Sequence, residues 1–252
     1  MSFSIPPRLN PLSPKNSKTA EPASFTHRSS VAGCRRHEPQ RKVLLLNRSA
    51  AAMPGLAHEA SQINPKELES LSERYGRPLC RQYCLETDAY MRAYRGQKDP
   101  DRRGEVVFAI RQVNGEILLH TKHRYETPIY RLPTGGIERD ELVEDALFRE
   151  IAEETGQEVR LRRFLGVLDC NFVSNGSGIH FVSYIFYLDS LSEELSPTDT
   201  EEVSGYRTVP IDELCTVAQT LRALGLERRC WGFWRSLAHD LVYNALMGCA
   251  EL

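Results

Sequence analysis

The sequence predicts an α/β protein in which a mixed sheet is covered by helices on both faces. The predicted elements run in the order of strands, one central helix, more strands and then helix, which is typical of such a layered fold. A chain of 252 residues with 41% apolar residues can bury one sizeable core. No repeat of about 20–50 residues is visible, so we expect one domain with extensions.

Residues 1–52 have the composition of a disordered tail. They contain six prolines, eight serines and nine Lys or Arg against two Glu. Two alternatives are open: the segment resembles an organellar transit peptide, or Met53 is the true start of the protein. Since the formal net charge is −2, the rest of the chain carries about −9. This balance gives no support for nucleic-acid binding through a broad basic face.

Residues 53–100 are expected to form an N-terminal helix and a linker. Asn64 suits a helix cap, Pro65 suits the first helical position and Gly76 suits a stop, so the helix should end near Tyr75.

The cysteines and the hydropathy indicate a cytoplasmic protein. No stretch approaches the ~18–20 apolar residues of a membrane helix. Seven cysteines, an odd number spread from Cys34 to Cys249, are typical of reduced intracellular thiols. Cys80 and Cys84 form a C-x3-C pair, and a zinc site there is an alternative to ordinary thiols.

Two β-rich runs begin the main domain. Residues 105–111 and 116–121 flank Asn114-Gly115, a dipeptide that favours a tight hairpin turn. A short strand is expected at 129–132, followed by a turn at 133–136. A helix should then run over 140–155 and end at Gly156.

The second half of the chain is expected to contain three strands and further helix. Strands are predicted at about 158–173 and 179–188, around the turn at 174–178, and at 206–209. A helix should open at Pro210. Helical spacing of apolar residues continues from 217 to 247, with interruptions near Gly225 and Gly232. Residues 216–252 should therefore pack as a helical segment on the domain.

The central helix places three acids on one edge. At about 100° per residue, Glu150, Glu153 and Glu154 span about 100° of the helix circumference. Each pair of like charges at these spacings costs about 0.2–0.5 kcal/mol in a solvated helix. Arg149 can pair with Glu153 but leaves the other acids uncompensated. A divalent cation, Mg²⁺ or Mn²⁺, suits a group of carboxylates without His or Cys partners.

The stretch GGIERDELVEDALFREIAEETGQ resembles the Nudix box of nucleoside-diphosphate-linked-moiety hydrolases. The matching positions are Gly135, Glu141, Arg149, Glu150, Ile151, Glu153, Glu154 and Gly156. Gln157, Thr134 and Asp140 depart from the usual pattern without removing a charged group. The resemblance implies an α/β/α sandwich, with the hydrolase domain at 101–215.

The resemblance also implies a chemistry, the metal-dependent hydrolysis of a diphosphate bond in a nucleoside diphosphate linked to another moiety. It assigns metal binding to Glu150, Glu153, Glu154 and the Gly135 carbonyl. Among the catalytic residues, Arg149 would orient a carboxylate, and Glu141 would act as an acid behind the metal ligands or between them. The general base is open between Glu150 and a later acid, Glu201 or Glu202.

Specificity in this fold lies outside the box. Arg131, Tyr130 and His123 are the candidates for substrate contacts, and ADP-ribose, other nucleotide sugars and nucleoside triphosphates are open as substrates. A homodimer is expected. Two other classes are open: a non-catalytic nucleotide sensor on the same fold, and an isoprenoid-diphosphate isomerase-like enzyme with a catalytic cysteine, for which Cys170 is not an obvious candidate.

Overall fold

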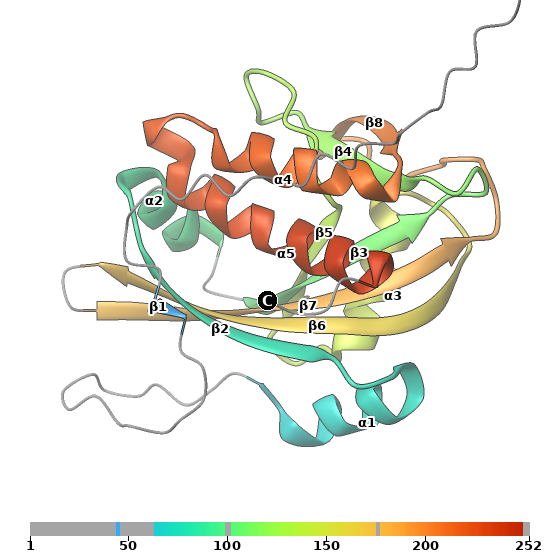
Figure 1. Cartoon of the computed structure of the whole chain (residues 1–252), viewed down its shortest axis with the longest axis horizontal. Coiled ribbons are helices and arrows are strands. Elements are labelled where there is room, and N and C mark those ends of the chain that lie inside the picture. The colour runs from blue at the N-terminus through green and yellow to red at the C-terminus, as the bar shows by residue number, and fades with distance from the viewer. Residues whose placement is uncertain (1–43, 46–62, 99–101, 175–176, 249–252) are drawn as a thin grey trace, which may run out of the picture. The chain divides into compact units, whose positions relative to one another are not determined.

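A computed structural model describes residues 44–45, 63–98, 102–174 and 177–248 (Figure 1). The disorder expected for residues 1–52 lies outside this described part, apart from the short strand β1 (Leu44–Leu45). No helix in the described part is both long and apolar enough to cross a membrane.

The strands form one mixed sheet, as predicted. Its order is β1-β2-β6-β7-β3-β4-β8. The bounds are β2 Leu79–Glu86, β3 Arg102–Arg111, β4 Ile117–Lys122, β6 Val159–Ser174, β7 Ser177–Ser190 and β8 Val203–Val209. Two pairs of neighbours, β2 with β6 and β3 with β7, are parallel, and the others are antiparallel. A further strand, β5 (Thr134–Glu138), pairs with β3 off this path.

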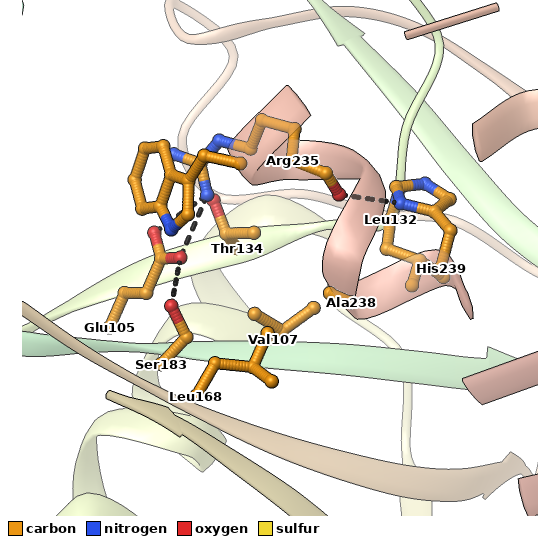
Figure 2. Close-up of a pocket in the computed structure, with 10 residues that line it drawn as sticks. Glu105, Val107, Leu132, Thr134, Leu168, Ser183, Arg235, Ala238 and His239 are labelled. Carbon is orange, nitrogen blue, oxygen red and sulfur yellow. Dashed lines mark hydrogen bonds and ion pairs between the residues drawn. The ribbon is translucent and has the colours of Figure 1, made fainter. Parts of the chain in front are cut away.

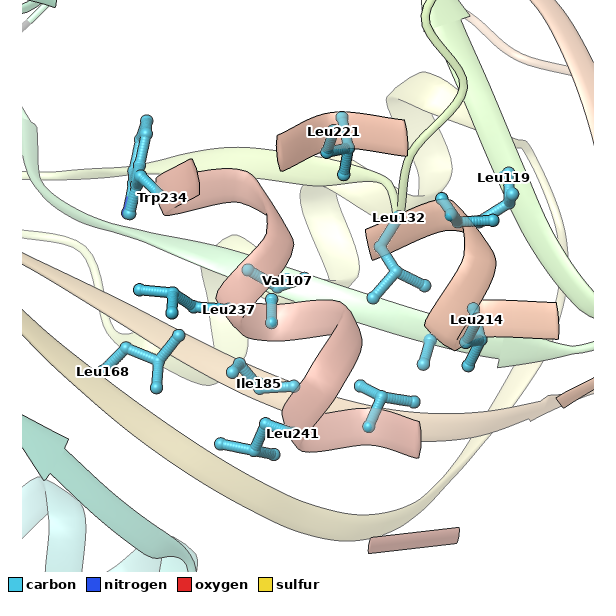
Figure 3. Packing of buried hydrophobic residues seen from close by; sticks show 14 of the residues in the cluster. Val107, Leu119, Leu132, Leu168, Ile185, Leu214, Leu221, Trp234, Leu237 and Leu241 are labelled. Atoms are coloured by element: carbon cyan, nitrogen blue, oxygen red, sulfur yellow. The ribbon is translucent and has the colours of Figure 1, made fainter. Parts of the chain in front are cut away.

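Helices cover both faces of the sheet, which confirms the predicted sandwich (Figure 1). One face carries α1 (Pro65–Tyr75) and α3 (Val143–Glu154). The other carries α2 (Ala89–Lys98), α4 (Leu214–Arg222) and α5 (Arg229–Met247). Strand β3 shows why both layers are needed, since Phe108 packs in the cluster under α3 and Val107 in the cluster under α5 (Figure 3). Such a strand is apolar on both sides.

Several element ends follow the local signals in the sequence. The side chain of Asn64 accepts hydrogen bonds from the backbone N–H groups of Lys66 and Glu67 and caps α1. The hairpin between β3 and β4 turns at Gly115, whose φ is +87°. Gly156 ends the turn after α3 with a φ of +64°. These positions need backbone angles that glycine adopts without strain.

Other elements differ from the sequence expectation. Neither β2 nor α2 was expected, because both lie in the range assigned to the N-terminal helix and linker. The strand expected at 129–132 is reduced to a single bridge between Arg131 and His120. The expected turn at 133–136 falls mostly within β5. Strand β4 pairs with β3 only at Arg111, so most backbone groups on the same edge of β3 have no partner in β4. From Arg102 to Val107, β3 pairs with β5 instead.

The long C-terminal segment breaks between α4 and α5 and not at Gly232, which lies inside α5. The break contains Gly225, as expected, and a short 3-10 turn at Leu226–Arg228. Gly232 has a packing role instead. A Cβ at this position would overlap the backbone carbonyl oxygen of Leu221 in α4, so the glycine allows the two helices to approach closely.

Gly232→Ala is therefore expected to destabilise the protein by about 1–3 kcal/mol, although alanine favours a helix more than glycine does. The clash is with backbone, which cannot rotate away. Urea unfolding would measure the change. Gly225→Ala is the matched control, because a Cβ there meets no atom within 4 Å, and its effect should stay within about 0.5 kcal/mol. Equal stabilities of the two variants would contradict the packing role.

Candidate active site

Helix α3 holds the acidic edge against the sheet. Its apolar stripe, with Ala146, Leu147 and Ile151, is buried in the cluster shared with β3 and β6. This anchoring places Glu150 and Glu154, one helical turn apart, in the buried region between α3 and the strands. Glu153 lies at the surface, with 42% of its side chain exposed. The three acids that the sequence placed on one edge therefore have different environments.

Glu150 packs on the β5 backbone. Its Oε1 accepts hydrogen bonds from the Gly136 N–H at 2.8 Å and from Arg149 Nη1 at 3.0 Å. A Cβ at Gly135 would overlap the Glu150 side chain, so only glycine fits there. Burial raises the pKa of Glu150 to about 7, the negative charge of Glu154 adds to this, and Arg149 opposes it.

Glu154 contacts one lysine and one histidine in the interior. Its Oε1 lies 2.8 Å from Lys122 Nζ, and its Oε2 lies 3.3 Å from His120 Nδ1. Burial alone would raise the pKa of this carboxyl, but His120 and Lys122 lower it to about 2. Burial, only partly offset by Glu154, lowers the pKa of His120 to about 4, so that imidazole is neutral at pH 7. Glu150 and Glu154 thus differ in charge behaviour although they are one turn apart.

The guanidinium group of Arg149 contacts three acids of the box. Its Nε and Nη2 contact both carboxylate oxygens of Glu141 at 2.7 and 2.9 Å, and its Nη1 contacts Glu150 and Glu153 at 3.0 Å each. Nη2 also donates to the Gly136 carbonyl at 2.8 Å. Glu141 in turn accepts from the Glu138 N–H at 3.1 Å. This network fixes the β5–α3 connection and orients Glu150.

The two late acids have different surroundings. Glu202 forms an ion pair with Lys122, and through that lysine it is linked to Glu154. Glu201 is exposed, and its backbone N–H donates to the Asp199 carboxylate at 2.9 Å. Of these two candidates, Glu202 is the one that the structure brings to the acidic edge.

The three candidates for substrate contacts are separated. Arg131 is fully buried and donates to Tyr125 Oη at 3.1 Å and to Thr134 Oγ1 at 3.0 Å. Tyr130 is half-buried beneath the guanidinium of Arg207, 4.7 Å from its ring centroid. His123 is exposed, and its backbone N–H donates to the Glu202 carbonyl.

A pocket that the sequence did not suggest lies next to Gly135 and is partly open to solvent. We call it the basic pocket. Its cationic side chains are Arg95, Arg102, Lys122, Arg124 and Arg235. Lys122 could have been noticed in the stretch HTKH, because it is a lysine at the end of the fully buried strand β4. No local pattern marks the other four, which come from separate elements.

The donor set at the acidic edge fits a hard divalent cation better than zinc. Buried carboxylate oxygens are available on α3, and among the described residues no group makes a well-aligned hydrogen bond to Glu154 Oε2. No three His, Cys, Asp or Glu side chains of the described residues lie close enough to form a ready metal cage. Arg149 and Lys122 occupy the spaces between the acids.

Two cysteine alternatives receive no support. Cys80 and Cys84 lie on one strand, β2, where a separation of four residues places the Cα atoms about 13 Å apart. That distance is too large for two ligands of one zinc ion. Cys170 is fully buried in the core, and burial raises the pKa of its thiol well above the usual value. An isomerase-like role for that thiol is disfavoured.

The model of the NUDIX domain family matches residues 101–228, and the chain belongs to this family. The match contains β5, α3 and both late acids. It leaves out α1, β2 and α2, and it ends before α5 begins at Arg229.

Two curated relatives and one solved structure show the range of similarity. The chain is 32% identical over 115 residues to an NAD-capped RNA hydrolase NudC of Vibrio parahaemolyticus, covering 46% of this chain and 41% of that protein. It is 33% identical over 90 residues to an ADP-ribose pyrophosphatase of Methanocaldococcus jannaschii, covering 36% and 52%. A MutT protein structure from Methanosarcina mazei has 19% identity and a TM-score of 0.38, covering 58% and 94%. The chain thus spans about half or less of the length of these two curated relatives.

Gly135→Ala should lower kcat by about a hundredfold. The new Cβ would displace the Glu150 side chain, and misplacing a catalytic group by about 1 Å can cost that factor. Steady-state kinetics on a hydrolysed diphosphate would measure the effect. Gly225→Ala is the control that should keep its activity, since it lies in the α4–α5 break. An active Gly135→Ala variant would show that the position of Glu150 is not critical.

Proposed function

We propose that this protein is a pyrophosphohydrolase that cleaves a diphosphate bond in a nucleoside diphosphate linked to another moiety. The observation that carries the proposal is the pair of buried glutamates on α3, one with a raised pKa and one with a lowered pKa, beside a basic pocket. Paired carboxylates next to cationic side chains suit phosphoryl transfer to water.

Glu150, Glu153 and Glu154, with the Gly135 carbonyl, would hold Mg²⁺ or Mn²⁺. When bound, the cation would neutralise phosphate oxygens and lower the pKa of a bound water. Arg149 and Glu141 keep Glu150 oriented on β5. Glu150 and Glu202 are the two candidates for the group that takes the proton from the attacking water. A pKa of about 7 suits Glu150 for this role near neutral pH.

A panel of substrates with Mg²⁺ or Mn²⁺ tests the proposal. NADH, NAD-capped RNA, ADP-ribose, a nucleotide sugar and nucleoside triphosphates would be compared for release of a nucleoside monophosphate. We expect turnover of at least one of them and its loss when the cation is chelated. If every compound is left intact with both metals, the proposed activity is wrong.

One observation favours a second candidate, a nucleotide-binding protein without turnover. The Lys122 ammonium lies between Glu154 and Glu202, where it competes with an incoming cation for their charge. Binding of a panel compound without hydrolysis would support this candidate. The cytoplasmic location and the homodimer stay predictions.

A further inference from the structure

The basic pocket has an excess of positive charge. Its five cationic side chains are accompanied by two carboxylates, Glu105 and Glu202. Both carboxylates are engaged, because Glu105 accepts from Arg235 Nη1 at 2.8 and 2.7 Å and Glu202 pairs with Lys122. The pocket therefore favours an anionic ligand.

The floor of the pocket is rigid. Glu105 on β3 also accepts from the Ser183 hydroxyl at 2.8 Å, so a buried chain of contacts links α5 to β3 and β7. Figure 2 shows these contacts in a neighbouring pocket, which shares Glu105, Thr134 and Arg235 with the basic pocket. The guanidinium of Arg95, from α2, lies 3.5 Å from the Phe181 ring centroid. Because these groups are buried and stacked, they are held in place before any ligand arrives.

The pKa values of two tyrosines near the pocket are lowered by nearby positive charges. Burial by itself raises the pKa of a phenol, yet the guanidinium groups of Arg235 and Arg124 lower that of Tyr94. At Tyr125, burial is outweighed by Arg131 and Arg124, and the pKa falls to about 8. A phenol ionises more readily only where an anion is favoured.

The pocket lies beside the acidic edge. Its wall includes Gly135, on which Glu150 packs, and Arg102 lies against Gly136. Exposed Arg124 lies over Tyr94, 5.7 Å from the ring centroid. If the diphosphate of a ligand lay at Glu150 and Glu154, the group attached to that diphosphate would thus lie near the guanidinium groups of Arg102 and Arg124.

We propose that the basic pocket binds a phosphate beyond the diphosphate that is cleaved, so that the preferred substrates are nucleoside triphosphates or other polyphosphates and not nucleotide sugars. Arg102 and Arg124 would contact this phosphate directly. The inference rests on the proposed function. Arg95 and Arg235 also line the pocket, and they lie outside the residues that match the family model.

Calorimetric titration of the full chain tests the proposal without turnover. The probes are the α,β-methylene analogues of ATP and ADP, in which the linkage between the α- and β-phosphorus atoms cannot be hydrolysed, each with and without Mg²⁺. The wild type should bind the triphosphate analogue at least about tenfold more tightly than the diphosphate analogue. Arg124→Gln should weaken the triphosphate analogue about tenfold and the diphosphate analogue by less than about twofold.

Arg160→Gln is the matched control, because Arg160 is exposed on β6 and does not line the pocket. It removes the same charge and should leave both affinities within about twofold. Urea unfolding would confirm that both variants fold. Equal affinity of the wild type for the two analogues, or equal effects of the two substitutions, would overturn the pocket assignment.

The outcomes separate this proposal from the proposed function. If Arg124→Gln weakens only the triphosphate analogue while no panel compound is hydrolysed, the pocket assignment stands and the hydrolase assignment fails. If a nucleotide sugar is hydrolysed well and Arg124→Gln leaves its KM and that of a nucleoside triphosphate unchanged, the hydrolase assignment stands and the pocket assignment fails.

Discussion

Glu154→Gln is expected to lower kcat by about a thousandfold, equivalent to about 4 kcal/mol of transition-state stabilisation. Glu154 is the buried acid whose pKa is held near 2, so it is the site's most persistent negative charge. Glutamine keeps the shape of the side chain but removes the charge that would hold a cation. Steady-state kinetics with saturating Mg²⁺ would measure the loss.

The same substitution should also destabilise the protein. Lys122 would keep Glu202 but lose its fully buried partner, and removing one member of a buried ion pair costs about 3 kcal/mol or more. The double variant Glu154→Gln/Lys122→Met separates the two effects. We expect it to regain much of the stability in urea unfolding without regaining kcat. A folded Glu154→Gln variant with more than a tenth of the wild-type kcat would exclude Glu154 from the catalytic site.

The stability of the metal-free protein should depend on pH through Glu150. Its pKa is about 7 in the folded protein, against an ordinary value of 4.5 for a glutamate side chain. Between these pH values the folded state keeps a proton that the unfolded state has lost, so stability falls as the pH rises. The contribution is fully lost above pH 7 and amounts to about 3 kcal/mol.

Glu150→Gln isolates this contribution. Buried His120 has a lowered pKa and works in the opposite direction below pH 6.5, so the wild-type profile alone is not informative. The difference in unfolding free energy between variant and wild type, measured in chelator from pH 4 to pH 8, should shift by about 3 kcal/mol in favour of the variant. Glu153→Gln is the control for removing a carboxylate from the surface side of α3, since that side chain is 42% exposed. A constant difference for Glu150→Gln would contradict the burial of its charge.

The local parts of the fold could be predicted from the sequence. The cap at Asn64, the hairpin turn at Gly115 and the stop at Gly156 depend on backbone angles and hydrogen bonds within a few residues. The acids of α3 likewise followed from helical spacing, and the structure places Glu150 and Glu154 together as expected. Such features are determined by neighbouring residues, so they can be recognised without knowing the tertiary contacts.

The pairing of the strands was harder to predict from the sequence. The expected turn at 133–136 falls mostly within β5, because β3 needs hydrogen-bond partners where β4 diverges from it. The segment taken as linker contributes β2, which pairs in parallel with β6 about eighty residues later. Local propensity contains no information about which distant backbone groups will pair, so these elements were missed or misassigned.

The sequence by itself determined the family's acidic helix and the order of most strands around it. Only the tertiary structure decided which acids are buried and which cations accompany them. Lys122 reaches Glu154 from a different element, and Arg95 and Arg235 reach the basic pocket from helices at opposite ends of the described chain. Charge and burial at a site depend on distances through space, and those are fixed only when the sheet and its two helical layers pack together.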